Sequence, residues 1–373
     1  MSDGIIVFGE DWSGLPSSTQ HLIRHLSHNR KTIWVNSIGL RHPRFSKYDL
    51  KRVWIKMKAI VKNLPRSETT TPFPVVAPRA IPWPGNAVAR LINRRLLVNQ
   101  VRSVATAEGI SQPILWISLP TAVDVAGALG EKGLIYYCGD DFGSLAGVDH
   151  EPVLKLEHEL VNKADIILAA SPELARRFPK EKTHLLPHGV DVDLFATPTQ
   201  KAPELPEKSP VAGFYGSIAE WLDFKLIAGA ASQLPHWKFI LIGDIKTDIS
   251  VLRPIPNISF LGSRPHYALP SYSQHWQASL LPFKDNAQIR ASNPLKLREY
   301  LAAGSAIIAT DFPALSKYRD LVHVVHDHME LAHALEATLK EDCSIKRIRQ
   351  KRVEKESWEA RANDINKLVK RYL

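Results

Sequence analysis

The sequence contains little cysteine and no long apolar run. Two cysteines, Cys138 and Cys343, occur in 373 residues, which excludes a disulfide scaffold and indicates a reducing compartment such as the cytoplasm. No Cys and His residues stand at metal-ligand spacing, so no metal site is predicted. No segment approaches the ~18 apolar residues of a membrane-spanning helix, and the first ten residues lack the basic start of a signal peptide. We therefore expect a soluble or peripheral protein.

Two families of binding motif are also absent. The pattern G-x-G-x-x-G does not occur, and no acid ends the second predicted strand, which disfavours NAD. No zinc finger or RNP-like aromatic motif accompanies the positive charge, so nucleic acid is not an expected partner. The composition, with 45% hydrophobic and 23% charged residues, is that of a globular protein, and 373 residues predict two domains.

Acids are scarce between residues 41 and 102. This stretch holds fourteen Lys or Arg against two acids, a local net charge of +12 in a chain of net charge +10. Within it, residues 48–62 place apolar side chains at helical spacing between lysines, which is typical of a basic amphipathic helix on an anionic membrane. A helix that packs on a sheet and exposes its lysines is the alternative. We expect residues 41–102 to attach the chain to the inner face of the cell membrane.

Short β-rich apolar runs alternate with helical patterns along the chain. This rhythm predicts parallel sheets with crossover helices, and it restarts after residue 210. The predicted strands are Ile5–Phe8, Ile33–Asn36, Ile114–Ile117, Leu134–Tyr137, Ile166–Ala169, Val211–Tyr215, Lys238–Ile242, Ile258–Leu261, Ala278–Leu281, Ala306–Ala309 and Leu321–Val325. The sequence therefore predicts an α/β protein with two Rossmann-like domains facing each other across a cleft.

Residues 196–210 divide the two halves. Four prolines and no aromatic residue in this segment predict a linker. We expect a first domain at 1–195, a second at 211–350 and a charged helical tail at 351–373. Ligands of open α/β sheets bind at the carboxyl ends of the strands, so the candidate residues are sought there.

Two loops of the first domain carry candidate side chains. The loop after the first strand places Asp11 and Trp12 at the cleft, and a plain turn that opens a helix at Ser17 is the alternative. Asp140 and Asp141 follow the strand Leu134–Tyr137, where a carboxylate of raised pKa could act as a general base. A helix N-cap made by either aspartate is the alternative.

The second domain offers a glycine turn and a charged helix. Residues 211–224 predict a strand, a turn at Gly216 and then a helix whose N–H groups and dipole suit a diphosphate. Further on, Lys296 and Glu299 stand one helical turn apart, a cation for phosphate and an acceptor for hydroxyl groups. An ordinary surface salt bridge between them is the alternative.

The order of five motifs resembles the GT-B glycosyltransferases. The likeness is closest to bacterial enzymes of surface-polysaccharide assembly, the teichuronic acid type, and more distant to the glucuronosyltransferase of xanthan synthesis. It covers nearly the whole chain and is most specific in the carboxyl half. The motifs are Pro187–Phe195, Phe214–Ser217, Ile258–Gly262, Leu280–Pro282 and Pro294–Gly304.

The resemblance implies a hexosyltransferase-like enzyme that moves a sugar from a nucleotide-sugar donor, itself a substrate, without metal or cofactor. By position, Glu299 would bind the ribose, and Lys296 with the Gly216 and Ser217 turn would bind the diphosphate. The loop from Gly262 to Arg264 would hold the base.

The resemblance also implies roles in the first domain. Asp140, or in its place Asp141, falls where inverting members have their base, and Asp11 and Trp12 lie on the acceptor side. The terminal helix would cross back onto this domain. Together with the basic stretch, this predicts a lipid-linked or other saccharide acceptor at an anionic membrane.

Two departures from the family pattern bear on the mechanism. The retaining class has a Glu-x7-Glu pair, whereas Ala291 stands eight residues before Glu299. The Arg and Lys that follow the glycine turn in that class are also missing, so the diphosphate needs other cations. These absences favour an inverting reaction. The candidate cations are Arg264, Arg290, Lys296 and Arg298.

Two other functions stay open on the sequence. A nucleotide-sugar epimerase of the same fold would need no membrane acceptor, and a scaffold that binds lipid or polysaccharide would need no catalysis.

Overall fold

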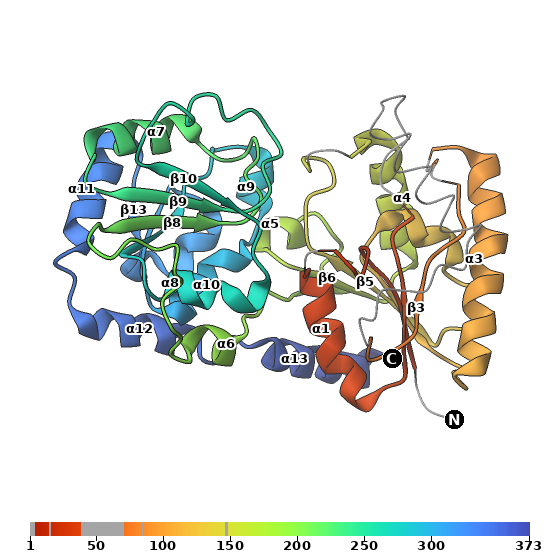
Figure 1. Ribbon diagram of the computed structural model, residues 1–373. Coiled ribbons are helices and arrows are strands. Elements are labelled where there is room, and N and C mark those ends of the chain that lie inside the picture. Colours follow the sequence, from red (N-terminus) through yellow and green to blue (C-terminus); the bar gives the residue numbers. More distant parts are fainter. Residues whose placement is uncertain (1–3, 15, 39–70, 82, 84, 146–147) are drawn as a thin grey trace. The chain divides into compact units, whose positions relative to one another are not determined.

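A computed structural model describes residues 4–14, 16–38, 71–81, 83, 85–145 and 148–373. The chain forms two compact units, residues 1–187 with 362–373 and residues 188–361, each built around its own sheet (Figure 1). The helix predicted at 48–62, and with it half of the basic stretch 41–102, lies outside the described residues.

A seven-stranded parallel sheet forms the centre of the first unit. Its strand order is β3-β2-β1-β4-β5-β6-β7. β2 and β3 follow each other on one side of β1, and β4 to β7 follow each other on its other side. The strands are β1 (Ile5–Phe8), β2 (Thr32–Val35), β3 (Val75–Val76), β4 (Ile114–Ile117), β5 (Gly133–Cys138), β6 (Ile166–Ala169) and β7 (Thr183–Leu185).

The central strands are continuous apolar runs because both faces of the sheet are covered. Every residue of β1, β2, β4, β5 and β6 is buried, as expected for a parallel sheet between helical layers. The helices of this unit are α1 (Ser18–Leu26), α3 (Ala87–Ala107), α4 (His150–Lys163) and α5 (Pro172–Ala175), with short 3-10 turns at Ser27–Asn29 and Pro120–Val125.

The second unit holds a six-stranded parallel sheet of order β10-β9-β8-β11-β12-β13. The order again reverses beside its first strand, at β8 and β11, so both units are Rossmann-like. The strands are β8 (Val211–Tyr215), β9 (Lys238–Ile242), β10 (Ile258–Gly262), β11 (Ala278–Leu281), β12 (Ala306–Ala309) and β13 (His323–Val324).

Helices cover both faces of the second sheet. Figure 1 shows α7 and α11 on one side and α8 and α10 on the other. The helices are α6 (Val192–Ala196), α7 (Phe224–Gln233), α8 (Pro270–Ser273), α9 (Ala287–Ala291), α10 (Leu295–Ala303), α11 (His328–Thr338) and α12 (Cys343–Val353), with 3-10 turns at His266–Ala268, Pro313–Lys317 and Arg319–Leu321. In the described ranges, no helix is long and apolar enough to cross a membrane.

Residues 196–210, predicted as a linker, lie inside the second unit. Ala202 and Leu205 are buried in its core, and the Ala202 N–H donates to the Ser271 carbonyl at 3.0 Å. The prolines exclude regular secondary structure, but they do not prevent packing. The chain passes between the units at Pro187 and again at Arg361.

The last helix, α13 (Trp358–Tyr372), starts in the second unit and ends in the first. In the second unit Trp358 is buried against the backbone of Gly189. In the first unit Arg30 donates to the Asn366 side chain at 2.5 Å, and the Leu373 side chain packs onto Gly133 at the start of β5. The last residues of the chain are therefore part of the packing of the first unit.

Gly213 in β8 tests how tightly the second core is packed. A Cβ at this position would lie 1.8 Å from the Trp276 ring, which a 2.8 Å hydrogen bond from its N–H to Ser279 holds in place. We expect Gly213→Ala to lower the free energy of unfolding by about 1–3 kcal/mol, measured by urea unfolding. Ser259→Ala, at an exposed position of β10, is the control, and an equal effect of both substitutions would contradict this packing.

Candidate functional site

In the first unit, the candidate residues lie in loops at the carboxyl ends of β1 and β5. Glu10, Asp11 and Trp12 follow β1, and Asp140 and Asp141 follow β5. β4 lies between these strands and pairs with both. The strand order reverses at β1 and β4, which is where open α/β sheets bind ligands.

The two aspartates after β5 differ in what surrounds them. Asp141 accepts hydrogen bonds from the Gly143 N–H at 3.0 Å and the Ser144 hydroxyl at 2.8 Å, and it forms an ion pair with Arg177. Arg177 also lies 3.4 Å from the buried Glu157. Asp141 therefore stabilises the loop. Neither aspartate is a helix N-cap, since Asp149 precedes α4.

Asp140 keeps its carboxyl available. Within the described residues its side chain has no hydrogen bond or ion pair, and the residue is exposed. Dense protein surroundings raise the pKa of Asp140 to about 6, and the charges of Glu10 and Asp141 add to this. A carboxylate that solutes can reach, with a pKa near neutrality, is suited to accept a proton.

Glu10 lies close enough to Asp140 to act on its pKa, although it was not among the residues predicted from the sequence. It accepts a hydrogen bond from the Ser17 hydroxyl at 3.0 Å, and burial raises its pKa. The hydroxyl of Tyr137 is buried there without a hydrogen-bond partner of good geometry, and its pKa is raised by burial and by Asp140 and Glu10. The signal in the sequence was the position of Glu10, two residues after β1.

Trp12 has a structural role in this loop. Its ring packs edge-on against Trp34 and Phe73, at 5.0 and 4.9 Å between centroids, and Arg24 lies over it at 5.2 Å. The Trp12 N–H donates to the Asn36 side chain at 2.9 Å. We infer that Trp12 shapes the loop that places Glu10.

Asp11 and the helix start complete this loop. The Asp11 carbonyl accepts from the Gly14 N–H at 2.8 Å and from the Gln20 side chain at 3.3 Å. Ser17 caps α1 as predicted, by accepting from the Gln20 N–H at 3.2 Å. Gln20, however, reaches the loop carbonyls and does not complete the capping box.

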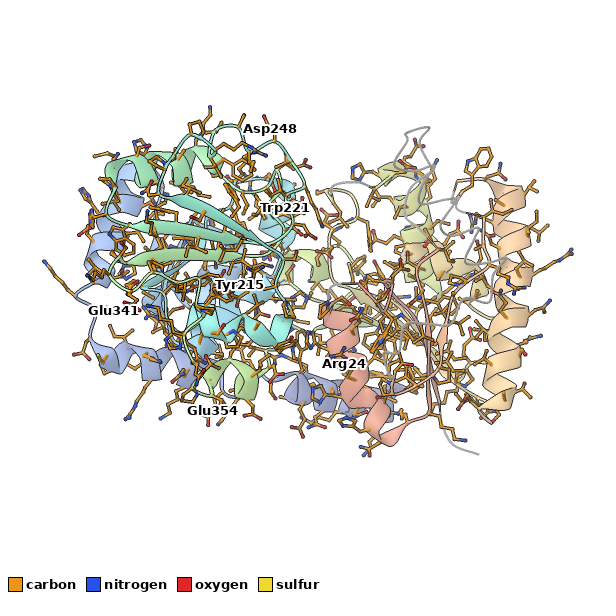
Figure 2. All side chains as sticks on the ribbon, viewed as in Figure 1. Arg24, Tyr215, Trp221, Asp248, Glu341 and Glu354 are labelled. Carbon is orange, nitrogen blue, oxygen red and sulfur yellow. The ribbon has the colours of Figure 1, made fainter. Side chains whose placement is uncertain are left out.

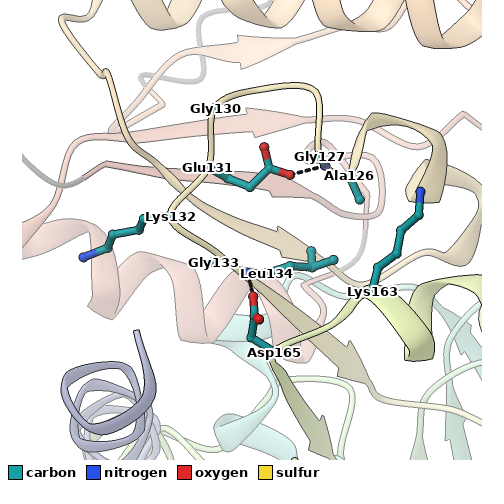
Figure 3. A pocket seen from close by; sticks show the side chains of 9 residues that line it. All are labelled: Ala126, Gly127, Gly130, Glu131, Lys132, Gly133, Leu134, Lys163 and Asp165. Carbon is teal, nitrogen blue, oxygen red and sulfur yellow. Dashed lines mark hydrogen bonds between the residues drawn. The ribbon is translucent and has the colours of Figure 1, made fainter.

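A cavity of about 400 Å³ opens at the other end of β5 (Figure 3). Gly133 and Leu134, at the amino end of the strand, line it together with Lys163 and Asp165. Asp165 accepts from the Leu134 N–H at 2.8 Å and so holds this edge of the sheet. The cavity is separated from Asp140 by the length of β5, and none of the predicted residues lines it.

In the second unit, two glycine turns lie against each other beside Lys296. Gly216 ends β8 with φ +137° and Gly243 ends β9 with φ +144°. A Cβ on Gly243 would lie 1.9 Å from the Gly216 carbonyl oxygen, and one on Gly216 would lie 2.1 Å from Cε of Lys296. Only glycine combines these backbone angles with this contact, so the turns allow Lys296 to cross the end of β8.

Lys296 lies at the start of α10, where backbone donors are also free. α10 begins after Pro294 without a side-chain cap, and the N–H groups of Leu295 and Lys296 donate to no group in the described part of the chain. Burial lowers the pKa of Lys296, although the nearby Glu299 opposes this. Its ammonium has no ion pair with any described residue. These donors and the positive helix end are suited to an anion.

Glu299, one turn further along α10, is buried and engaged by a histidine. Nε2 of His266 lies 2.9 Å from its Oε1. Burial alone would raise the pKa of Glu299, but the hydrogen bond and charge of His266, followed by the charge of Lys296, outweigh it and lower the pKa. The hydroxyl of Tyr215 (labelled in Figure 2) is buried nearby without a well-formed hydrogen bond. Glu299 therefore stays ionised, with Oε2 left as an acceptor.

His266 was missed by the sequence analysis. It lies in the 3-10 turn His266–Ala268, just after the predicted Gly262 to Arg264 loop, and Phe195 packs edge-on against its ring at 5.4 Å. Its place two residues after that loop was the available signal. Gly262 itself has φ +68° and its carbonyl accepts from the Gly243 N–H at 2.9 Å, which joins the ends of β9 and β10.

The helix predicted directly after Gly216 is wrong. The chain continues as irregular structure and α7 begins only at Phe224. In between, isolated β-bridges pair Ile218 with Ile245 and Leu222 with Phe283. Asp223 caps that helix by accepting from the Leu226 N–H at 3.0 Å. A carboxylate therefore already occupies the N-terminus that was expected to hold a diphosphate. Ser217 follows the turn and is half-buried.

The three candidate arginines are all paired. Arg264 reaches Glu204 at 3.0 Å and the Leu261 carbonyl at 2.6 Å. Arg290 forms an exposed two-point pair with Asp285 at 2.6 and 2.7 Å. Arg298 is buried, 2.8 Å from Glu356 and 2.6 Å from the Asn293 side chain. Of the four candidate cations, only Lys296 is left without an ion pair among the described residues.

Two parallel-sheet units with candidate residues at both switch points define the class of fold, that of the GT-B glycosyltransferases. No family model matches the chain. It is 28% identical over 244 residues to TuaH of Bacillus subtilis (strain 168), whose name describes a glycosyltransferase of teichuronic acid biosynthesis. The match spans 60% of this chain and 61% of TuaH.

Solved structures share the fold over nearly the whole chain. Sucrose-phosphate synthase from Thermosynechococcus elongatus has a TM-score of 0.72 at 15% identity, over 99% of this chain and 98% of its own. Anabaena HepE, solved with UDP and glucose, has a TM-score of 0.69 at 13% identity, over 99% of both chains. These comparisons confirm the GT-B fold and the resemblance to surface-polysaccharide glycosyltransferases that the sequence predicted.

The influence of Glu10 on Asp140 can be measured directly. Because like charge raises the pKa of a carboxyl group, we expect Glu10→Gln to lower the Asp140 pKa from about 6 toward its ordinary value of 3.8. The measurement is a carbon-13 NMR titration of the aspartate carboxyls. Glu151→Gln, an exposed position on α4 paired with Lys155, is the control. An unchanged Asp140 titration in the Glu10 variant would show that Glu10 does not raise this pKa.

Proposed function

We propose that this chain is a metal-independent glycosyltransferase that moves a sugar from a nucleotide-sugar donor to a lipid-linked saccharide acceptor in cell-surface polysaccharide synthesis. The observation that supports this most is on α10, where Lys296, without an ion pair to any described residue, lies one turn from the ionised, buried Glu299 and beside N–H groups that no described group engages. The names of TuaH and of the HepE complex agree with it. The enzyme would act in the cytoplasm, on the inner face of the membrane.

The donor would be held by α10 and the adjoining turns. The Lys296 ammonium and the N–H groups of Leu295 and Lys296 would bind the diphosphate, and the Gly216 and Ser217 turn would border it. Oε2 of Glu299 would accept hydrogen bonds from ribose hydroxyls, with His266 fixing the carboxylate through Oε1. The backbone of the Gly262 to Arg264 loop would contact the base, since the Arg264 side chain is engaged.

Asp140 would act as the base in an inverting reaction. The acceptor hydroxyl gives its proton to the Asp140 carboxylate, its oxygen attacks the anomeric carbon, and the nucleoside diphosphate leaves. With a pKa of about 6, Asp140 is mostly ionised at pH 7 and is a stronger base than an ordinary aspartate. Lys296 and the α10 donors would stabilise the charge that develops on the leaving group.

The donor is best identified with a panel of nucleotide sugars. Thermal stabilisation by one member, with slow release of its nucleoside diphosphate, would support transfer and name the donor. Conversion into a new free nucleotide sugar would point instead to an epimerase. A chain that binds no nucleoside diphosphate would contradict the proposal and favour a non-catalytic scaffold.

Asp140→Asn separates chemistry from donor binding. We expect turnover to fall by about 10²–10⁴-fold, the range of general-base effects, while the affinity for nucleoside diphosphate stays near normal. The measurements are steady-state kinetics and calorimetric titration. Glu151→Gln, at an exposed position on α4 of the same unit, is the control and should change neither quantity. Normal turnover with lost affinity would refute the role of Asp140 as base.

Substitutions on α10 separate the two parts of the donor. Hydrogen bonds to charged groups contribute about 1.5–3 kcal/mol, so Glu299→Gln should weaken binding of a nucleoside diphosphate by about tenfold to a hundredfold. Lys296→Ala should weaken the diphosphate by a similar factor and leave the free nucleoside unaffected. Arg290→Ala, which breaks an exposed pair, should change neither. Equal effects of all three variants in calorimetry would contradict this assignment.

A further inference from the structure

The surface of the first unit carries a group of exposed apolar side chains around the start of α3. Trp83, Val88 and Leu91 are 51%, 66% and 53% exposed. Of the fourteen exposed large apolar side chains in the described ranges, six lie between residues 81 and 96. These six, called here the α3 surface, are Ile81, Trp83, Val88, Leu91, Ile92 and Leu96. Contiguous exposed apolar groups of this kind mark interaction sites.

The apolar side chains point outward because α3 is already packed on its other side. Ala89, Asn93, Leu97, Val101 and Ala105 are buried and repeat every four residues. Val88, Leu91 and Ile92 lie on the opposite side of the helix, where a surface helix ordinarily presents polar residues. Figure 1 shows α3 along the outer side of the first unit. The unit's own core therefore does not use these side chains.

The segment that carries the α3 surface has charges of one sign. No acid occurs from residue 69 to 107, a stretch that holds five arginines. Arg90 pairs with Asp124 and Glu159 at 2.7 and 2.6 Å, and Arg102 donates to a carbonyl. Arg94 and Arg95 are exposed and have no ion pair with described residues. They leave uncompensated positive charge beside the apolar side chains.

From this combination we propose that the α3 surface docks on an anionic lipid bilayer. Trp83, Val88, Leu91 and Ile92 insert into the boundary between head groups and acyl chains, and Arg94 and Arg95 contact the lipid phosphates. Exposed Trp and Leu beside two unpaired Arg, in a segment that itself holds no acid, match the chemistry of such an interface. Residues 41–70, with nine Lys or Arg and two acids, add long-range attraction to the same lipids.

This docking surface rests on the proposed function, since it would bring the enzyme to a membrane-borne acceptor. It also gives the apolar contact with the bilayer a different position from the one expected from the sequence. The sequence pattern predicted that contact at residues 48–62, whereas the α3 surface would make it with side chains of a folded helix and the residues just before it. Donor binding on α10 does not depend on it. Vesicle binding and sugar-nucleotide binding can therefore fail separately.

Flotation of the full-length chain with vesicles tests the proposal. Wild type should float with phosphatidylcholine vesicles that contain phosphatidylglycerol, and less with phosphatidylcholine alone or at high salt. The double variant Leu91→Glu with Ile92→Glu should reduce binding by about tenfold or more, because charges replace the inserted side chains. Arg94→Ala with Arg95→Ala should reduce only the part of binding that depends on anionic lipid.

Ile348→Glu is the matched control, since Ile348 is an equally exposed apolar residue on α12 of the second unit (49%). Unchanged thermal unfolding and nucleoside diphosphate binding in every variant would show that the fold is retained. The proposal is overturned if the Leu91 and Ile92 variant floats like wild type. It is also overturned if substitutions in residues 48–62 alone abolish flotation, or if the double variant changes only the oligomeric state in sedimentation.

Discussion

The contact of Lys296 with Gly216 is the constraint on which the second unit's candidate site depends. The ends of β8 and β9 meet backbone to backbone, which only two glycines of positive φ permit. The space beside Gly216, where a side chain would stand, is filled by the Lys296 stem. This places an ammonium at the uncapped start of α10 and puts Glu299 one turn behind it. A larger residue at Gly216 would displace the Lys296 stem, and one at Gly243 would displace the Gly216 turn that borders it.

Pairing decides which of the charged residues can take part in binding. Arg264, Arg290 and Arg298 each form an ion pair with a carboxylate of the same unit. Asp141 is likewise paired with Arg177. Lys296 and Asp140 stand out because neither forms an ion pair with a described residue. Ion pairs within a unit stabilise it or its loops, and they reduce what the same groups can offer a ligand. Lys296 and Asp140 are therefore better candidates for ligand binding and proton transfer than the charged residues that form ion pairs.

Much of the fold was predictable, because buried parallel strands are continuous apolar runs. β1, β4, β6, β8, β9, β11 and β12 have the predicted bounds. β3 and β7 were missed because they are two and three residues long and not fully buried. The site was less predictable. The partners Glu204 and Glu356 come from distant sequence positions, and the delay of α7 to Phe224 follows from bridges that no local pattern shows.

The two units use carboxyl groups in opposite ways. In the first, dense protein surroundings and the neighbouring acids Glu10 and Asp141 raise the pKa of Asp140 to about 6, so that it can take up a proton. In the second, His266 and Lys296 overcome burial and lower the pKa of Glu299, so that it remains a fixed acceptor. A base must change its protonation state during a reaction, whereas a hydroxyl-binding carboxylate must not. Neighbouring charge, more than residue type, therefore assigns the two roles.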